Sequence, residues 1–160
     1  MGSTLRPVKG VRGFTLIELI MVMVLLGVMA VFLIPRLNTK DFEARGFHDE
    51  TLALLRYAQK AAIAQRRTVC VAFTTTSATL SEATAAGATI CDGTLVGPRG
   101  ETPGQVSAAS GVAYQAVPGS AFYFNSLGQP SQALSLQVTQ GGSGIGVTIS
   151  VEADSGYVHD

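Results

Sequence analysis

Few side chains in this 160-residue chain could support chemistry. The histidines are His48 and His159, and the cysteines are Cys70 and Cys91. Neither histidine has a carboxylate and a nucleophile at a recognisable catalytic spacing. The cysteines match neither a metal-binding spacing nor a C-x-x-C redox pair. We therefore expect no catalytic residue, no metal site and no cofactor.

A glycine-rich segment at residues 141–146 superficially resembles a phosphate loop or a nucleophile elbow. Ser143 lacks the glycine two residues later that the elbow requires, and neither a lysine nor a predicted helix follows. A hairpin turn explains the segment better. A membrane-anchored periplasmic enzyme or binding domain is the alternative from another functional class, since it would have the same layout of apolar segment and domain.

The most unusual charge is Glu18, because it lies in a long apolar run. Of the 21 residues from Phe14 to Ile34, only Glu18 is charged. As a helix with a rise of about 1.5 Å per residue, this run is roughly 30 Å long, the thickness of a bilayer's hydrocarbon core. A chain of this size cannot easily cover a helix that is apolar on every face. The sequence therefore predicts a transmembrane helix over residues 14–34.

Glu18 needs an explanation inside such a helix. A charge at the centre of a membrane helix costs roughly 2.5–3.5 kcal/mol, and less near an end, so such residues usually have a partner. Alternatively, Glu18 lies near the first turn, where the helix dipole favours an anion, and reaches the headgroups. The residues alone leave both interpretations open.

The apolar run begins within the sequence Gly-Phe-Thr-Leu-Ile-Glu at residues 13–18, after a short basic leader. This arrangement resembles the class III signal of type IV pilins and pseudopilins. The resemblance implies that residues 1–13 are a leader peptide, which prepilin peptidase removes by cleavage between Gly13 and Phe14 before it methylates the Phe14 amine. It also implies that Glu18 pairs with the terminal amine of a neighbouring subunit. The chain's own Phe14 amine, one turn away, is the alternative partner.

The charges of the leader predict the membrane topology. The leader contains Arg6, Lys9 and Arg12 and no acid, which favours a cytoplasmic N-terminus. Removing the leader would leave a mature chain with a net charge of about −3. We predict a single-pass protein of the bacterial inner membrane with a periplasmic globular domain, later part of a pilus or pseudopilus. In the periplasm Cys70 and Cys91 can form a disulfide that closes a loop of about 20 residues, worth roughly 3 kcal/mol. Two buried free thiols are the alternative.

The remaining pattern predicts an α+β fold, with a long N-terminal helix packed on an antiparallel β-sheet domain. Pro35 should kink the helix because it lacks an N–H, with some bending or unwinding as far as Gly46. An apolar stripe from Phe47 continues the helix, so residues 35–67 are its periplasmic part. Residues 68–160 form the β-rich domain, in which 74–89 should hold weak strands, and 92–120 should be mostly loop with room for a short strand at 112–117. The clearer strands are expected at 68–73, 121–124, 134–139, 145–151 and 157–158.

Three further segments, at residues 55–71, 122–130 and 151–159, are similar to the GspH/FimT group of minor pilins and pseudopilins. Within that group they look closest to the MshC proteins of the mannose-sensitive haemagglutinin (MSHA) pilus. The resemblance implies a structural subunit that helps to assemble an MSHA-type pilus, or alternatively a minor pseudopilin of a type II secretion system. It implies as partners other pilin or pseudopilin subunits, prepilin peptidase, the inner membrane and the assembly platform.

Some FimT-like members of this group bind DNA through basic residues near the C-terminus. This chain differs there, because Glu152, Asp154 and Asp160 make its tail acidic. Acidic side chains repel phosphates, so we expect no nucleic-acid partner.

Overall fold

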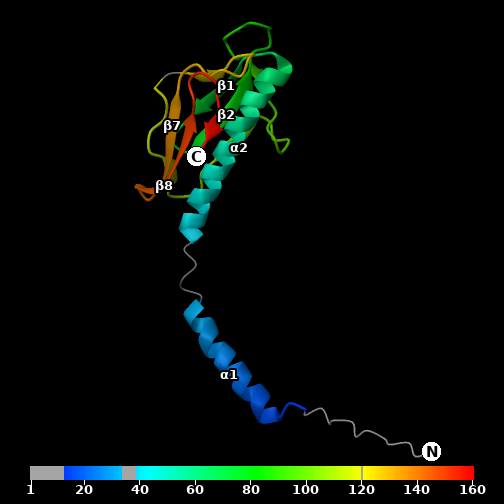
Figure 1. Ribbon diagram of the computed structural model, residues 1–160, viewed down its shortest axis with the longest axis vertical. Coiled ribbons are helices and arrows are strands. Elements are labelled where there is room, and N and C mark those ends of the chain that lie inside the picture. The colour runs from blue at the N-terminus through cyan, green and yellow to red at the C-terminus, as the bar shows by residue number, and fades with distance from the viewer. Residues whose placement is uncertain (1–12, 34–38, 120) are drawn as a thin grey trace, which may run out of the picture. The chain divides into compact units, whose positions relative to one another are not determined.

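The computed structural model of the chain describes residues 13–33, 39–119 and 121–160. The chain divides into two compact units, Met1–Asn38 and Thr39–Asp160. The described part of the first unit is residues 13–33, which include helix α1 (Leu16–Leu33), and the second unit begins with helix α2 (Thr39–Gln65) (Figure 1). The strands that follow are β1 (Val69–Phe73), β2 (Ser77–Glu82), β3 (Gly93–Thr94), β4 (Gln105–Ser107), β5 (Val112–Tyr114), β6 (Phe122–Phe124), β7 (Leu134–Gln140), β8 (Ser143–Val151) and β9 (Val158–His159).

Helix α1 covers most of the predicted apolar span, and residues 13–30 are all exposed. Across the described ranges, no helix combines the length and the hydropathy that a membrane span requires. The transmembrane helix over residues 14–34 therefore stays a prediction. Pro35 and the kink expected there lie outside the described residues.

Helix α2 lies within the range expected for the periplasmic part of the helix, residues 35–67. It runs unbroken from Thr39 through Gly46, so the expected unwinding does not occur at residues 39–46. A helical glycine costs about 1 kcal/mol relative to alanine. The buried side chains of Ala44 and Phe47, on either side of Gly46, offset this cost by packing into the core, and Asp41 suits the positive end of the helix dipole.

The end of α2 directs the chain into the first strand. Arg66 adopts a left-handed conformation with φ of 53°, and the N–H of Arg67 donates to the carbonyl of Ala62 at 3.2 Å. This hydrogen bond satisfies one of the free carbonyls at the helix end. The chain therefore leaves the helix at Gln65 and enters β1 only a few residues later.

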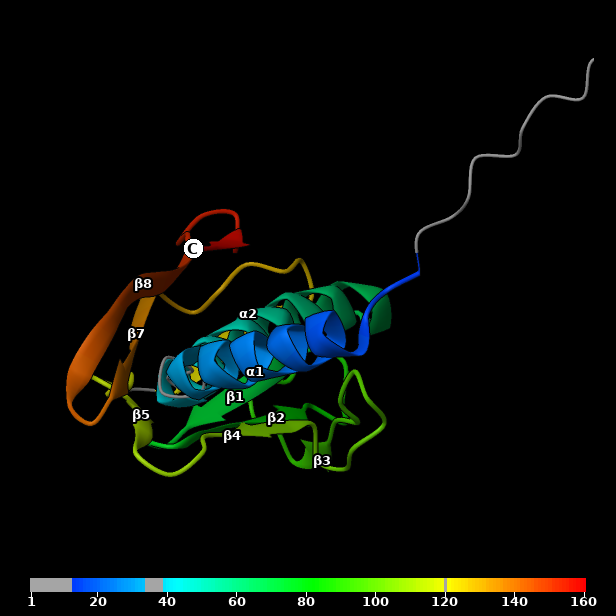
Figure 2. The same cartoon turned by 90° about the horizontal axis from the view of Figure 1, so that it is seen from below.

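The antiparallel strands form two sheets where the sequence suggested one. The first has the order β3-β2-β1-β6, with β4 also paired to β2, and the second has the order β5-β7-β8-β9. Helix α2 contacts strands of both sheets, which lie on different sides of it in Figure 2. One helix can bury its apolar stripe against both sheets, so the domain has one continuous core.

Strand β2, in the first sheet, is better formed than its composition predicts. It pairs with β1 along the whole length of that strand, from Val69 opposite Glu82 to Phe73 opposite Ala78. Ala78 and Leu80 alternate inward, which gives β2 one buried face despite its small residues. Strands β3 and β4 lie in the stretch expected to be loop. The side chains of Leu95, which follows β3, and of Val106, the central residue of β4, are buried.

The core contains one buried polar cluster at α2. The Thr51 hydroxyl donates to the carbonyl of Phe47 at 2.7 Å and lies 2.7 Å from the hydroxyl of Tyr114. The rings of Phe47 and Tyr114 are 4.8 Å apart. Burial raises the pKa of Tyr114 well above its ordinary range, so this hydroxyl stays protonated. The cluster thus joins α2 to the second sheet without leaving a buried hydroxyl unpaired.

Candidate functional site

The candidate site is the short segment that leads into α1. Gly13 and Phe14 precede the helix and are exposed, Phe14 at 77%. A Cβ added at Gly13 would meet no atom within 4 Å. A peptide bond outside regular structure can enter a protease without unfolding a helix. The Gly13–Phe14 bond is therefore accessible for cleavage.

Thr15 fixes where α1 begins. Its hydroxyl accepts a hydrogen bond from the N–H of Glu18 at 3.3 Å, and its carbonyl accepts one from the N–H of Leu19 at 3.2 Å. These bonds are typical of an N-cap residue, and a Thr followed by Glu three residues later matches the capping-box spacing. The sequence analysis missed this role, which the spacing alone could have revealed. The cap holds Glu18 in the first helical turn, close along the chain to Phe14.

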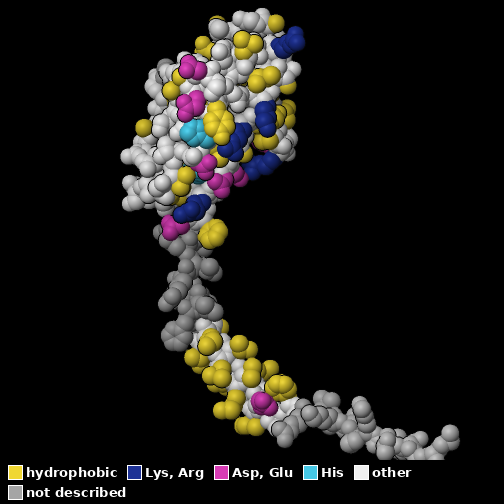
Figure 3. Space-filling model, viewed as in Figure 1, with side chains coloured by type: hydrophobic (Ala, Val, Ile, Leu, Met, Phe, Trp, Pro, Cys, Tyr) yellow, Lys and Arg dark blue, Asp and Glu magenta, His cyan; other side chains and the backbone are white. Residues whose placement is uncertain are grey.

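Glu18 is the acidic residue of the first turn of α1. Figure 3 shows an acidic side chain at this end of the helix among apolar ones. Apolar side chains from Leu16 to Met29 are exposed on every face of the helix. An exposed apolar surface of this extent marks a contact with lipid or with another protein. The segment therefore combines one carboxylate with an apolar surface suited to such a contact.

Cys70 and Cys91, for which the sequence favoured a disulfide, are joined by one, with their Cα atoms 6.1 Å apart. The segment between β2 and Cys91 is also held by hydrogen bonds. The Thr68 hydroxyl donates to the carbonyl of Ala88 at 2.7 Å, and Thr84 donates from its N–H and hydroxyl to Asp92 at 2.8–2.9 Å. The bonds from Thr84 lower the pKa of Asp92. The disulfide thus closes a loop that already has a defined structure.

The two histidines lie in different places and neither contacts a nucleophile. His48 is buried on α2, where its Nδ1 atom lies 3.0 Å from the Asp49 carboxylate. His159 lies in β9 with its Nε2 atom 3.0 Å from Glu152, and its ring stacks on Tyr157. The hydrogen bond to Glu152 raises the pKa of His159. Within the described ranges, no three His, Cys, Asp or Glu side chains are placed to hold a metal ion.

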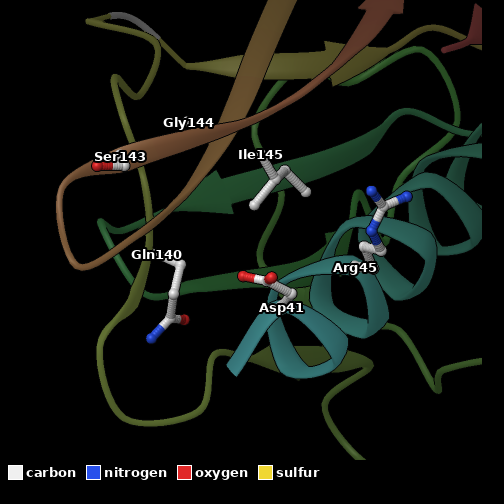
Figure 4. A pocket seen from close by; sticks show the side chains of 6 residues that line it. All are labelled: Asp41, Arg45, Gln140, Ser143, Gly144 and Ile145. Atoms are coloured by element: carbon white, nitrogen blue, oxygen red, sulfur yellow. The ribbon is translucent and has the colours of Figure 1, made fainter. Parts of the chain in front are cut away.

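The glycine-rich segment forms a hairpin turn. Gln140 pairs with Ser143, and the two glycines between them have φ angles of 59° and 86°. Positive φ at both central residues is the type I′ geometry that favours glycine. The turn borders a cavity of about 280 Å³, which Figure 4 shows between α2 and the hairpin, lined by Asp41, Arg45, Gln140, Ser143, Gly144 and Ile145. The Ser143 hydroxyl points away from Asp41 and Arg45 in this view, so the cavity holds no serine aligned with a base.

Two family models match the chain. The prokaryotic N-terminal methylation motif matches residues 8–34, a range that includes Gly13, Phe14 and Glu18. The model described as type II transport protein GspH matches residues 49–155, about two thirds of the chain. No curated protein matches the chain.

Among solved structures, the fold is similar to a crystal structure of the type IV minor pilin FimU of Pseudomonas aeruginosa (strain PAO1), in space group P21. The TM-score is 0.54 at 16% identity, over 76% of this chain and 90% of that one. A second crystal form of the same protein, in space group P65, gives a TM-score of 0.49 at 17% identity, over 72% and 90% of the two chains. The P21 comparison shows that the α+β fold is pilin-like.

Proposed function

The chain belongs to the type II transport protein GspH family, and we propose that it is a minor pilin that helps to assemble a type IV pilus of the MSHA type. The family and the fold are those of structural pilins and pseudopilins. The methylation motif over residues 8–34 carries the proposal, because it implies processing by prepilin peptidase and assembly with other subunits. The assembly platform of the inner membrane is the other partner that this role requires.

Processing is proposed to occur at the Gly13–Phe14 bond, followed by methylation of the new Phe14 amine. The exposure of both residues ahead of α1 supports this site. Cleavage removes the basic leader and leaves a chain that starts with an apolar ring. The new amine then lies one helical turn before Glu18, at the same end of α1.

Glu18 is proposed to pair with the Phe14 amine of a neighbouring subunit. Among packed apolar helices the effective dielectric constant is low, so two opposite charges attract strongly and an unpaired one is costly. The Thr15 cap supports this role because it holds Glu18 in the first turn. One charge pair per contact would then fix how far neighbouring helices are displaced along their axes.

Residues 14–34 are proposed to anchor the chain in the inner membrane before assembly, with the domain that begins at α2 in the periplasm. The methylation motif supports the anchoring. The Cys70–Cys91 disulfide supports the periplasmic location, since disulfides persist in oxidising compartments.

A minor pseudopilin of a type II secretion system is the second candidate function. It is favoured by the matching family model, whose description names type II transport. Both machines require the same processed helix, so α1 does not discriminate between them. The globular surface must do so, because it determines which neighbouring subunits the chain contacts.

Deleting the gene in its host distinguishes the two candidates. We expect surface pili, counted by electron microscopy, to fall at least ten-fold, because a minor subunit that helps to start assembly limits how many filaments form. Secretion of type II substrates, measured in the culture medium, should be unchanged, and the wild-type gene should restore piliation. Loss of secretion with normal pili would instead assign the chain to the pseudopilus. Unchanged pili and unchanged secretion would contradict both functions.

A further inference from the structure

A groove lies between α2 and the segment that joins β3 to β4. Its volume is about 210 Å³, and its apolar walls are formed by Ala53, Leu54, Pro98 and Val106. We call this space the Leu54 groove. Leu54 and Val106 are buried, whereas Ala53 and Pro98 are exposed, so the groove reaches the surface of the domain. Walls of this kind favour a ligand with a hydrocarbon part.

The outer wall of the groove, residues 96–101, is fixed by hydrogen bonds. The Tyr57 hydroxyl on α2 donates to the carbonyl of Val96 at 2.8 Å. Within the segment, the N–H of Gly97 donates to the carbonyl of Glu101 at 2.8 Å. The wall therefore has a defined structure without any ligand, and the groove is preformed.

Three charged side chains, Glu50, Arg99 and Glu101, line the same groove. The Nη1 atom of Arg99 lies 3.0 Å from Oε1 of Glu50, and its Nε atom lies 3.9 Å from Oε2 of Glu101. In the described part of the chain, neither carboxylate has an ion pair with another cation. One guanidinium thus faces two carboxylates, which leaves one negative charge uncompensated at the groove.

The two carboxylates can both respond to a further cation. The carboxylate of Glu101 lies where a Cβ at Gly97 would be, and its Oε2 accepts from the N–H of Arg99 at 3.0 Å. Its Oε1 is buried and has no hydrogen-bond partner, which is costly for a carboxylate. The side chain of Glu50 is 46% exposed, so it can accept a second donor. A positive charge brought into the groove would therefore be stabilised.

We propose that the Leu54 groove binds a lysine side chain of a partner protein, with the methylene stem on the apolar walls and the ammonium beside Glu50 and Glu101. This inference goes beyond the proposed function and does not depend on it. Lysine matches the groove in both respects, because it carries a compact cation at the end of an apolar stem. An uncharged apolar side chain would leave the excess negative charge in place, and an acidic one would be repelled.

The exposure of the charged groups favours a protein partner over a free amine. The side chains of Arg99 and Glu50 are 60% and 46% exposed, and ion pairs between exposed groups contribute little in water. A free amine would therefore be held only at millimolar concentration. A lysine on a folded surface brings further contacts, since the exposed Ala53 and Pro98 lie at the same groove.

A small probe tests the groove itself. The full chain, labelled with ¹⁵N in detergent micelles, is titrated with Nα-acetyl-lysine N-methylamide and followed by NMR. We expect saturable shifts of the amide signals of Ala53, Leu54 and Glu101, and about ten-fold weaker binding of the norleucine analogue, which has a similar stem and no charge. Ala53→Leu should abolish the shifts, because the larger side chain fills the groove at an exposed helical position. The absence of saturable shifts, or equal binding of the two compounds, would overturn the proposal.

Charge variants give opposite expected signs. Glu50→Gln and Glu101→Gln should each weaken binding of the lysine compound about five-fold, whereas Arg99→Gln should strengthen it about five-fold by removing the competing cation. Thermal unfolding of each variant establishes that it is folded. Weaker binding in all three variants would contradict the proposal, because it would show that they disturb the groove rather than its charge.

Cross-linking in membranes of the host tests the partner. A carbodiimide joins a carboxylate to an amine that touches it, and mass spectrometry identifies the joined peptides. We expect an amide between Glu50 or Glu101 and a lysine of another protein, and we expect Ala53→Leu to remove it. Cross-links that persist in Ala53→Leu, or that join these carboxylates only to lysines of this chain, would overturn the partner.

Discussion

Replacing Glu18 with Ala should reduce incorporation of the chain into filaments at least ten-fold and leave its insertion into the membrane unchanged. Removing one partner of a buried ion pair typically costs about 3–5 kcal/mol, because the other charge stays buried and unpaired. A tenfold change in an equilibrium corresponds to about 1.4 kcal/mol. Losing even a partly hydrated ion pair, which costs less than a fully buried one, is therefore enough for a ten-fold fall in incorporation. Insertion depends on the apolar residues of α1, and removing a charge from that run does not oppose it.

Immunoblots of sheared filaments and of membranes from the same cells measure the ratio of assembled to inserted chain. Glu18→Gln should behave like Glu18→Ala, since it keeps the size of the side chain and removes only the charge. Asp154→Asn is the matched control, because it removes an exposed carboxylate of the globular domain and leaves the whole of α1 intact. Normal incorporation of the Glu18→Gln variant would contradict the charge pair.

Replacing both Cys70 and Cys91 with Ser should lower the free energy of unfolding of the globular domain by about 3 kcal/mol. The disulfide closes a loop with a sequence separation of 21, and its loss gives that loop more freedom in the unfolded chain. For a domain of this size the melting temperature should fall by on the order of 10 °C. Circular dichroism of the full chain in detergent, followed during heating, measures the change.

The double cysteine variant should keep its native sheet at low temperature. The pairing of β1 with β2 does not depend on the disulfide, and the hydrogen bonds from Thr68 and Thr84 still hold the segment before Cys91. Reducing the wild-type chain should reproduce the shift in melting temperature, which separates the loss of the bond from any effect of the new serines. An unchanged melting temperature after complete reduction would contradict a stabilising disulfide.

The features that sequence could predict are those with a strong local pattern. The stripe on α2 repeats with the helical period, and its members Thr51, Leu54, Leu55 and Ala58 are all buried. The longer strands β7 and β8 have β-branched or alternating residues and were expected near their observed positions. Their turn was predictable because glycine is favoured where φ is positive.

The features that sequence could not predict depend on contacts from elsewhere in the chain. Strand β2 consists mainly of small residues and becomes a strand because Ala78 and Leu80 pack into the core. Strands β3 and β4 are only two and three residues long, too short for any periodicity to register. The unbroken helix through Gly46 is similar, because buried Ala44 and Phe47 override the low helix propensity of this glycine.

The candidate site stays a prediction. The spacing of Gly13, Phe14 and Glu18 resembles the class III signal, and that resemblance implied both the processing and the charge pair. The proposed partner of Glu18 belongs to another subunit, so the contacts within one chain do not test it.

Intact mass and N-terminal sequencing of the protein from membranes of its native host test the central claim most directly. The account predicts a chain that starts at Phe14, with a mass increased by one methyl group at its amine and with no residue of the leader. A chain that still starts at Met1, in cells whose prepilin peptidase is active on other substrates, would contradict it.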